Sequence, residues 1–224
     1  KAKCPDGVVV LRVWTPVVYQ FTDNPETSAE HYWNNWIWPQ LLLATEAERK
    51  LIDYVEGPNE GGSTPTWNSV ADAQWFSRFW VRLIELMKAR DVRPCVGSIA
   101  VGNPPGTPTE IRDRFLAFAP AMEAALAAKG SWSYHSYTIN YTQNVSEEIW
   151  FSLRYRQLYS ILRQNRSSLT RLPLILTEGG VDATGNPLTS GWQARGTAEK
   201  FQQWLTWFDS EIRKDPYVIG VTLF

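Results

Sequence analysis

Residues 51–60 read LIDYVEGPNE, and residues 172–180 read LPLILTEGG. In both stretches a short apolar run leads into a glutamate beside glycine, which is a turn signal. Each run has the length and composition of a buried β-strand. A carboxylate at the end of such a strand is typical of a parallel sheet whose C-terminal edge carries the chemically active side chains.

The same strand pattern recurs along the whole chain. The strand-like runs are residues 8–14, 51–56, 93–101, 132–138, 172–177 and 217–224. Apolar residues at helical spacing lie between them, clearly in 69–90 and 201–212 and less cleanly in 150–162. This alternation predicts an α/β fold with a parallel sheet covered by helices, in one domain over 1–224. No glycine-rich phosphate loop follows a strand, which favours a (β/α)₈ barrel over a nucleotide-binding sheet.

Composition excludes several classes of function. Lys and Arg number 22 against 23 Asp and Glu, so the chain lacks the basic surplus of a nucleic-acid or membrane-surface protein. The two histidines exclude a zinc site built on three imidazoles. Twelve Trp and nine Tyr exceed what a core of this size requires, and such side chains stack on flat ligands such as sugar rings. No signal-peptide pattern or membrane-spanning run is visible, so the compartment stays open, with export suspected.

Glu60 and Glu178 are the candidate catalytic residues. We expect both carboxyls to point into the mouth of a barrel, where burial and mutual repulsion would raise at least one pKa. A protonated carboxyl beside an ionised one is what glycoside hydrolysis needs. The alternative is that each glutamate is an exposed loop residue beyond its strand.

These motifs resemble the retaining glycoside hydrolases of clan A, the barrel superfamily of many cellulases and β-glycosidases. Asn59-Glu60 resembles the clan's acid/base motif on the fourth strand, and Glu178, between Thr177 and Gly179-Gly180, resembles the nucleophile on the seventh. Two strand-like runs lie between them, as in the clan, and the likeness spans nearly the whole chain. It implies that Glu60 is the acid/base, that Glu178 is the nucleophile and that Asn59 bonds the sugar 2-hydroxyl. It implies no metal or organic cofactor.

The strand count implied by the resemblance makes the chain an incomplete barrel. If Glu60 belongs to strand four, residues 8–14 form strand three and residues 217–224 form strand eight. Strands one and two and the last helix would be missing. We therefore expect the isolated 224-residue chain to be poorly soluble or oligomeric and inactive, and the complete protein to be an active monomer.

Strand parity adds candidate substrate-binding residues, because alternate residues share a face. Arg12 and Trp14 share a face, and the resemblance implies an Arg near the nucleophile; an interior ion pair of Arg12 with Glu56 is the alternative. His135 and Tyr137 share another face, where clan members place an aromatic hydroxyl against the nucleophile. Tyr137 is therefore the stronger candidate, and His135 alone fits a core histidine equally well.

Three tryptophans at or beyond strand ends are candidate sugar platforms: Trp14, Trp67 and Trp192. The function expected is a retaining hydrolase of β-linked glycosidic bonds in an oligosaccharide or polysaccharide, with its two carboxyls roughly 5–5.5 Å apart. Two alternatives remain. One is a barrel that binds carbohydrate without cleaving it, and the other is a cell-wall hydrolase acting on peptidoglycan.

Overall fold

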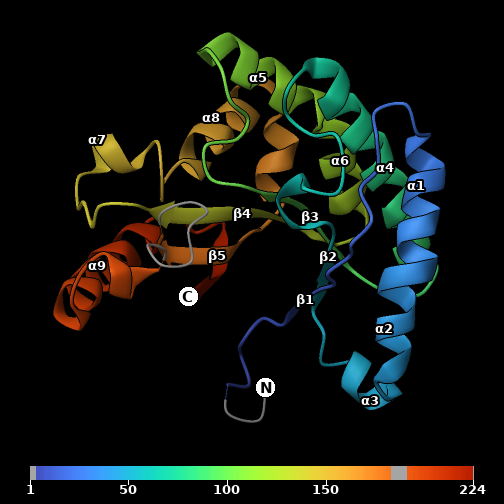
Figure 1. Ribbon diagram of the computed structural model, residues 1–224, viewed down its shortest axis with the longest axis horizontal. Helices are drawn as coiled ribbons and strands as arrows, with labels where there is room; N and C mark the ends of the chain where they lie inside the picture. The colour runs from blue at the N-terminus through green and yellow to red at the C-terminus, as the bar shows by residue number, and fades with distance from the viewer. Residues whose placement is uncertain (1–3, 183–190, 224) are drawn as a thin grey trace.

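The computed structural model describes residues 4–182 and 191–223, which form a six-stranded parallel sheet flanked by helices (Figure 1). The sheet order is β1-β2-β3-β4-β5-β6, so each strand pairs with its neighbours in the sequence. The strands are β1 (Val10–Arg12), β2 (Tyr54–Glu56), β3 (Pro94–Ile99), β4 (Ser131–Thr138), β5 (Leu174–Val181) and β6 (Val218–Leu223). The α/β fold predicted with six parallel strands is confirmed, although Phe224 of the last predicted strand lies outside the described residues.

Helices stand around the outside of the curved sheet (Figure 1). The α-helices are α1 (Pro25–Tyr32), α2 (Trp38–Leu43), α3 (Glu46–Arg49), α4 (Val70–Lys88), α5 (Pro108–Ala117), α6 (Ala119–Ala127), α7 (Val145–Glu148), α8 (Tyr155–Asn165) and α9 (Ala198–Ile212). Short helical turns are η1 (Trp33–Ile37), η2 (Asn59–Gly61), η3 (Ser167–Arg171) and η4 (Trp192–Ala194). Within the described ranges every helix is too short or too polar to cross a bilayer.

The core lies between the sheet and the helices, with α4 at its centre. The apolar stripe of α4 is buried, and Phe76 stacks on Phe118 with ring centroids 5.1 Å apart. Gly57, directly after β2, packs so closely on α4 that an added Cβ would lie 2.4 Å from the Trp80 ring. This contact fixes the chain where β2 turns toward Glu60.

The segment predicted as a helix over 150–162 begins later than expected. Residues 149–154 form turns, and α8 starts at Tyr155. Strand β5 continues past the predicted end at Thr177, so Glu178 lies within the strand rather than beyond it.

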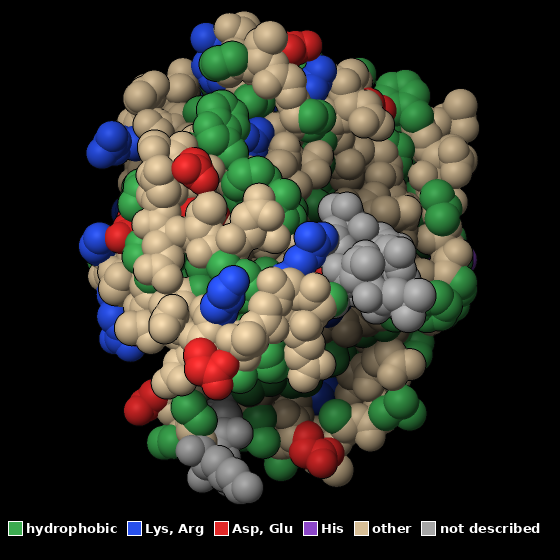
Figure 2. Space-filling model, turned by 60° about the vertical axis from the view of Figure 1, so that its left-hand side comes forward, with side chains coloured by type: hydrophobic (Ala, Val, Ile, Leu, Met, Phe, Trp, Pro, Cys, Tyr) green, Lys and Arg blue, Asp and Glu red, His purple; other side chains and the backbone are tan. Residues whose placement is uncertain are grey.

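Charged side chains of both signs are interspersed on the face shown in Figure 2. This surface agrees with the near-neutral net charge of the chain. It gives no sign of the one-signed patch that a polyanion would require.

Candidate active site

Parallel pairing brings the predicted site residues to one edge of the sheet. Arg12, the last residue of β1, is in register with Glu56, the last residue of β2. His135 of β4 is in register with Glu178 of β5. Because all six strands run the same way, these C-terminal positions gather at one edge, as the two sequence motifs predicted.

Glu60 reaches this edge from a tight turn after β2. Its backbone is in the left-handed region with φ 52°, and Gly61 follows with φ 65°. An added Cβ on Gly61 would lie 2.0 Å from Thr66, so only glycine fits there. The backbone N–H of Glu60 donates to Ser98 Oγ at 3.3 Å. Non-glycine residues held in this region are uncommon and cluster at functional sites.

The hydroxyl of Tyr137 lies between the two carboxylates. Its oxygen is 2.8 Å from Glu60 Oε1 and 2.7 Å from Glu178 Oε2. One carboxylate oxygen of Glu60 lies within 4.8 Å of one of Glu178. The phenol has a single hydrogen, so it donates to only one carboxylate at a time, and the second contact is a hydrogen bond only when that carboxyl is protonated. One phenolic hydrogen therefore serves both carboxylates.

His135 connects this pair to the strand behind it. The ring is fully buried, with Nδ1 2.8 Å from Glu60 Oε1 and Nε2 3.2 Å from Ser98 Oγ. Arg12 Nη1 also lies 3.3 Å from Nε2. Since a guanidinium only donates, the network assigns the hydrogen to Nδ1, which donates to Glu60.

Arg12 completes the cluster from the first strand. It donates to Glu178 Oε1 and lies 3.5 Å from Glu56 Oε2, so the contacts with both glutamates considered from the sequence occur together. Burial works against its charge, but Glu56 and Glu178 outweigh burial, and the pKa of Arg12 is raised above its usual value. Glu56 is itself buried and accepts from Thr177 Oγ1 at 2.8 Å.

The pKa of Glu60 is lowered overall, so the expected rise does not occur at this carboxyl. The hydrogen bond from His135 is the largest effect and lowers the pKa of Glu60; burial opposes it, and the Tyr137 hydroxyl adds to the lowering. The hydroxyl of Tyr137 itself stays protonated, because burial and the hydrogen bond to Glu178 raise its pKa far above the usual value.

The same cluster has the donor set of a small metal site. Glu60, His135 and Glu178 each offer one ligand atom, all within 4.8 Å of one another. The Tyr137 oxygen already lies within 3.2 Å of His135 Nδ1 and closer to both carboxylates. An ion bound between these atoms at about 2.0–2.2 Å would compete with that hydroxyl. These atoms therefore fit a hydrogen-bonded cluster of side chains better than they fit a bound metal ion.

The remaining predicted site residues differ in whether they are exposed or packed against other side chains. Asn59 is exposed beside Glu60, and Trp14 is 78% exposed beyond β1. Trp192 stacks on Phe201 of α9, with ring centroids 5.0 Å apart, and its carbonyl accepts from Tyr141. The expectation for Trp67 is wrong, because its ring is buried edge-on against Phe76 and Phe118 in the core.

Sequence reasoning missed Ser98. Its hydroxyl contacts both His135 and the backbone of Glu60, and its own φ is 46°. The sequence carried only a weak signal for it. Ser98 is a small residue with a hydroxyl group near the end of an apolar strand, and the two glutamates take the same position relative to their own strands.

No protein-family model matches this chain, and no curated protein matches it by sequence. Among solved structures, the bacterial orthologue of human α-L-iduronidase is 14% identical with a TM-score of 0.47, over 89% of this chain and 32% of that chain. A GH5-4 broad specificity endoglucanase from an uncultured bacterium is 11% identical with a TM-score of 0.47, over 97% of this chain and 74% of that one. XacCel5A in complex with cellopentaose is 13% identical with a TM-score of 0.47, over 98% and 76%.

This chain thus spans about a third of the iduronidase orthologue and about three quarters of the endoglucanase and of XacCel5A. All three likenesses are to glycoside hydrolases, but at these identities and TM-scores they assign no activity.

Proposed function

We propose that the protein is a retaining glycoside hydrolase that cleaves β-linked glycosidic bonds in an oligosaccharide or polysaccharide. The observation that carries the proposal is the pair of carboxylates, Glu60 and Glu178, joined through one Tyr137 hydroxyl with their nearest oxygens within 4.8 Å. This spacing fits the retaining class, whose carboxyl groups lie roughly 5–5.5 Å apart, and leaves too little room for the water of an inverting enzyme.

The two steps follow from the side chains present. Protonated Glu60 gives its proton to the glycosidic oxygen while Glu178 attacks the anomeric carbon, so the leaving sugar departs as an alcohol. Glu60, now a carboxylate, takes a proton from water, and the hydroxide attacks the anomeric carbon and releases Glu178. Arg12 and Tyr137 hold Glu178 in place, and Asn59 contacts the sugar beside Glu60.

Paired variants of the complete protein test these roles. Glu178→Gln should abolish turnover on every substrate, because no nucleophile remains. Glu60→Ala should keep turnover on aryl glycosides with activated leaving groups, which need no proton, and azide should accelerate it. The measurement is the rate of hydrolysis on activated and natural substrates, with NMR identification of the first anomer released.

Two outcomes would contradict the proposal. Equal loss of both substrate types in Glu60→Ala would mean that the roles are assigned wrongly. Sugar binding by the complete protein without turnover would leave a carbohydrate-binding protein in place of an enzyme.

A further inference from the structure

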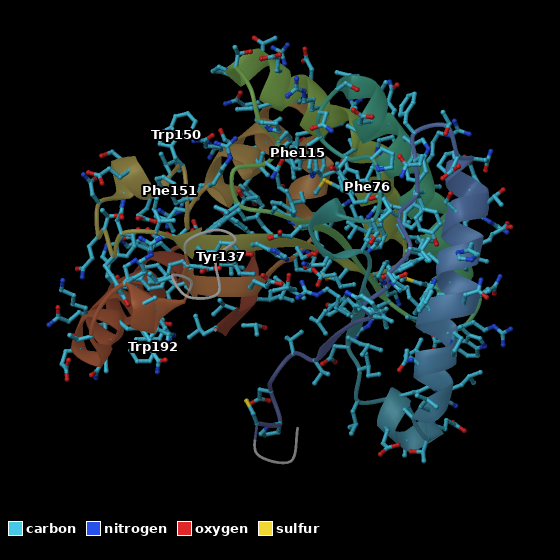
Figure 3. All side chains as sticks on the ribbon, viewed as in Figure 1. Phe76, Phe115, Tyr137, Trp150, Phe151 and Trp192 are labelled. Atoms are coloured by element: carbon cyan, nitrogen blue, oxygen red, sulfur yellow. The ribbon has the colours of Figure 1, made fainter. Side chains whose placement is uncertain are left out.

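Trp150 lies in the turn segment between α7 and α8, beyond the C-terminal end of β4, with Tyr137 below it in Figure 3. Among the residues that the structure describes, the exposed tryptophans are Trp14 and Trp150, and Trp150 is 51% exposed. A single exposed aromatic is ordinary on a protein surface. The support beneath Trp150 is what sets it apart.

The first support is Arg154, a buried cation. Its side chain is 4% exposed, and its guanidinium carbon lies 5.5 Å from the centroid of the Trp150 ring. Nη2 donates to the carbonyl of Pro104 at 2.8 Å, which ties Trp150 to the loop after β3. Nη1 lies 3.4 Å from the side-chain oxygen of Gln157, a neutral acceptor. The guanidinium therefore contacts neutral acceptors on one side and the face of the Trp150 ring on another.

The second support is Glu148, two residues before Trp150 and fully buried. One oxygen accepts from Thr138 Oγ1 at 2.6 Å and from the Thr142 hydroxyl. The other accepts from Ser152 Oγ at 2.6 Å and from the Ser152 N–H at 3.2 Å. Glu148 therefore holds both ends of the segment by hydrogen bonds. One of its donors, Thr138, is next to Tyr137 in the chain.

We propose that Trp150 is a stacking platform for a pyranose ring of the substrate, in a subsite separated from the cleaved bond. The inference rests on the proposed function and narrows its substrate to chains longer than the two sugars that flank the bond. A tryptophan presents a broad apolar face that suits the C–H face of a sugar. Because Arg154 and Glu148 already order the segment, binding loses little conformational entropy there.

Oligosaccharide binding tests this inference apart from catalysis. Affinities of the complete protein carrying Glu178→Gln are measured by calorimetry for β-1,4-linked gluco-, xylo- and mannohexaose and for the matching disaccharides. Adding Trp150→Ala should weaken binding of the best hexasaccharide roughly tenfold, which corresponds to about 1.4 kcal/mol, and leave the disaccharide within twofold. In otherwise wild-type protein, Trp150→Ala should raise KM for the hexasaccharide with kcat on a short aryl glycoside unchanged.

Two controls separate stacking from folding. Trp150→Phe keeps an aromatic face and should restore most of the affinity. Leu43→Ala removes another exposed apolar side chain, which lies on α2 and is 80% exposed. It should leave the affinities for the hexasaccharide and the disaccharide unchanged. Unchanged hexasaccharide affinity in Trp150→Ala, or equal weakening of hexasaccharide and disaccharide, would overturn the platform while the proposed function stands. Absence of both binding and turnover across the panel would overturn the proposed function and the platform with it.

Discussion

At the scale of single residues, the site is governed by the number of hydrogens available to two carboxylates. Glu60 and Glu178 share one phenolic hydrogen from Tyr137, and His135 supplies a second to Glu60. The His135 bond stabilises the ionised form of Glu60, which is the form that accepts a proton in the second step. The first step needs the opposite form, so acid should favour it.

The pH dependence of His135→Phe checks this balance. The variant lacks the largest contribution that lowers the pKa of Glu60, so that pKa should rise. A general acid with a higher pKa stays protonated to higher pH, and the basic limb of kcat/KM on a substrate with a poor leaving group should move up. The measurement is the pH–rate profile of both proteins. A basic limb at the same or a lower pH would mean that His135 does not control Glu60.

Tyr137→Phe tests the shared hydroxyl. Without it the two carboxylates lose their common hydrogen-bond partner, and kcat should fall roughly 10²-fold, as for other lost transition-state hydrogen bonds. Because the phenyl ring keeps the packing, the melting temperature should change little. A large loss of stability with kcat retained would make Tyr137 a structural residue only.

At the scale of elements, the segment between β4 and α8 is held by one buried carboxylate. The four hydrogen bonds to Glu148 come from neutral hydroxyl and amide groups on both ends of the segment. Removing such a buried carboxylate lowers the stability of the fold, because its hydrogen-bond donors stay buried without an acceptor.

Glu148→Ala should therefore destabilise the protein by about 1–3 kcal/mol, measured by chemical denaturation. Glu147→Ala is the matched control. Glu147 is its exposed neighbour on α7 and accepts a hydrogen bond from Asn144 Nδ2 at 3.1 Å. Its loss should cost less than about 0.5 kcal/mol. Equal losses in the free energy of unfolding for the two substitutions would contradict the proposal that Glu148 holds this segment in place.

At the scale of the whole molecule, the sheet is open. Within the described residues, β1 pairs only with β2 and β6 only with β5. The outer strand β6 exposes apolar side chains, among them Ile219 at 40%. Unpaired apolar edges of this kind promote association between chains.

The 224-residue chain should accordingly self-associate as its concentration rises, as measured by sedimentation velocity. Ile219→Lys places a charge on the edge strand and should reduce the association. Leu43→Lys makes the same charge change on α2 and should not. A chain that stays monomeric at every concentration would show that these edge strands do not cause self-association.

The sequence by itself determined the α/β fold, the six strands and the position of Glu60 and Glu178 at one edge. The physical reason is that apolar strand runs and turn residues are local signals, and parallel topology places all strand ends together. Strand parity grouped Arg12 with Trp14 and His135 with Tyr137, and the resemblance implied that Arg12 and Tyr137 lie near the nucleophile. Each of these features depends on residues close in the sequence or on the order of strands.

Only the tertiary structure decided which aromatics face solvent and which way the Glu60 carboxyl titrates. Trp67 follows a strand yet lies in the core because Phe76 and Phe118 surround it, whereas Trp150 was expected in a helix and is exposed. The pKa of Glu60 depends on a hydrogen bond to His135, 75 residues away. Burial and electrostatics arise from contacts between distant segments, and no local pattern encodes their geometry.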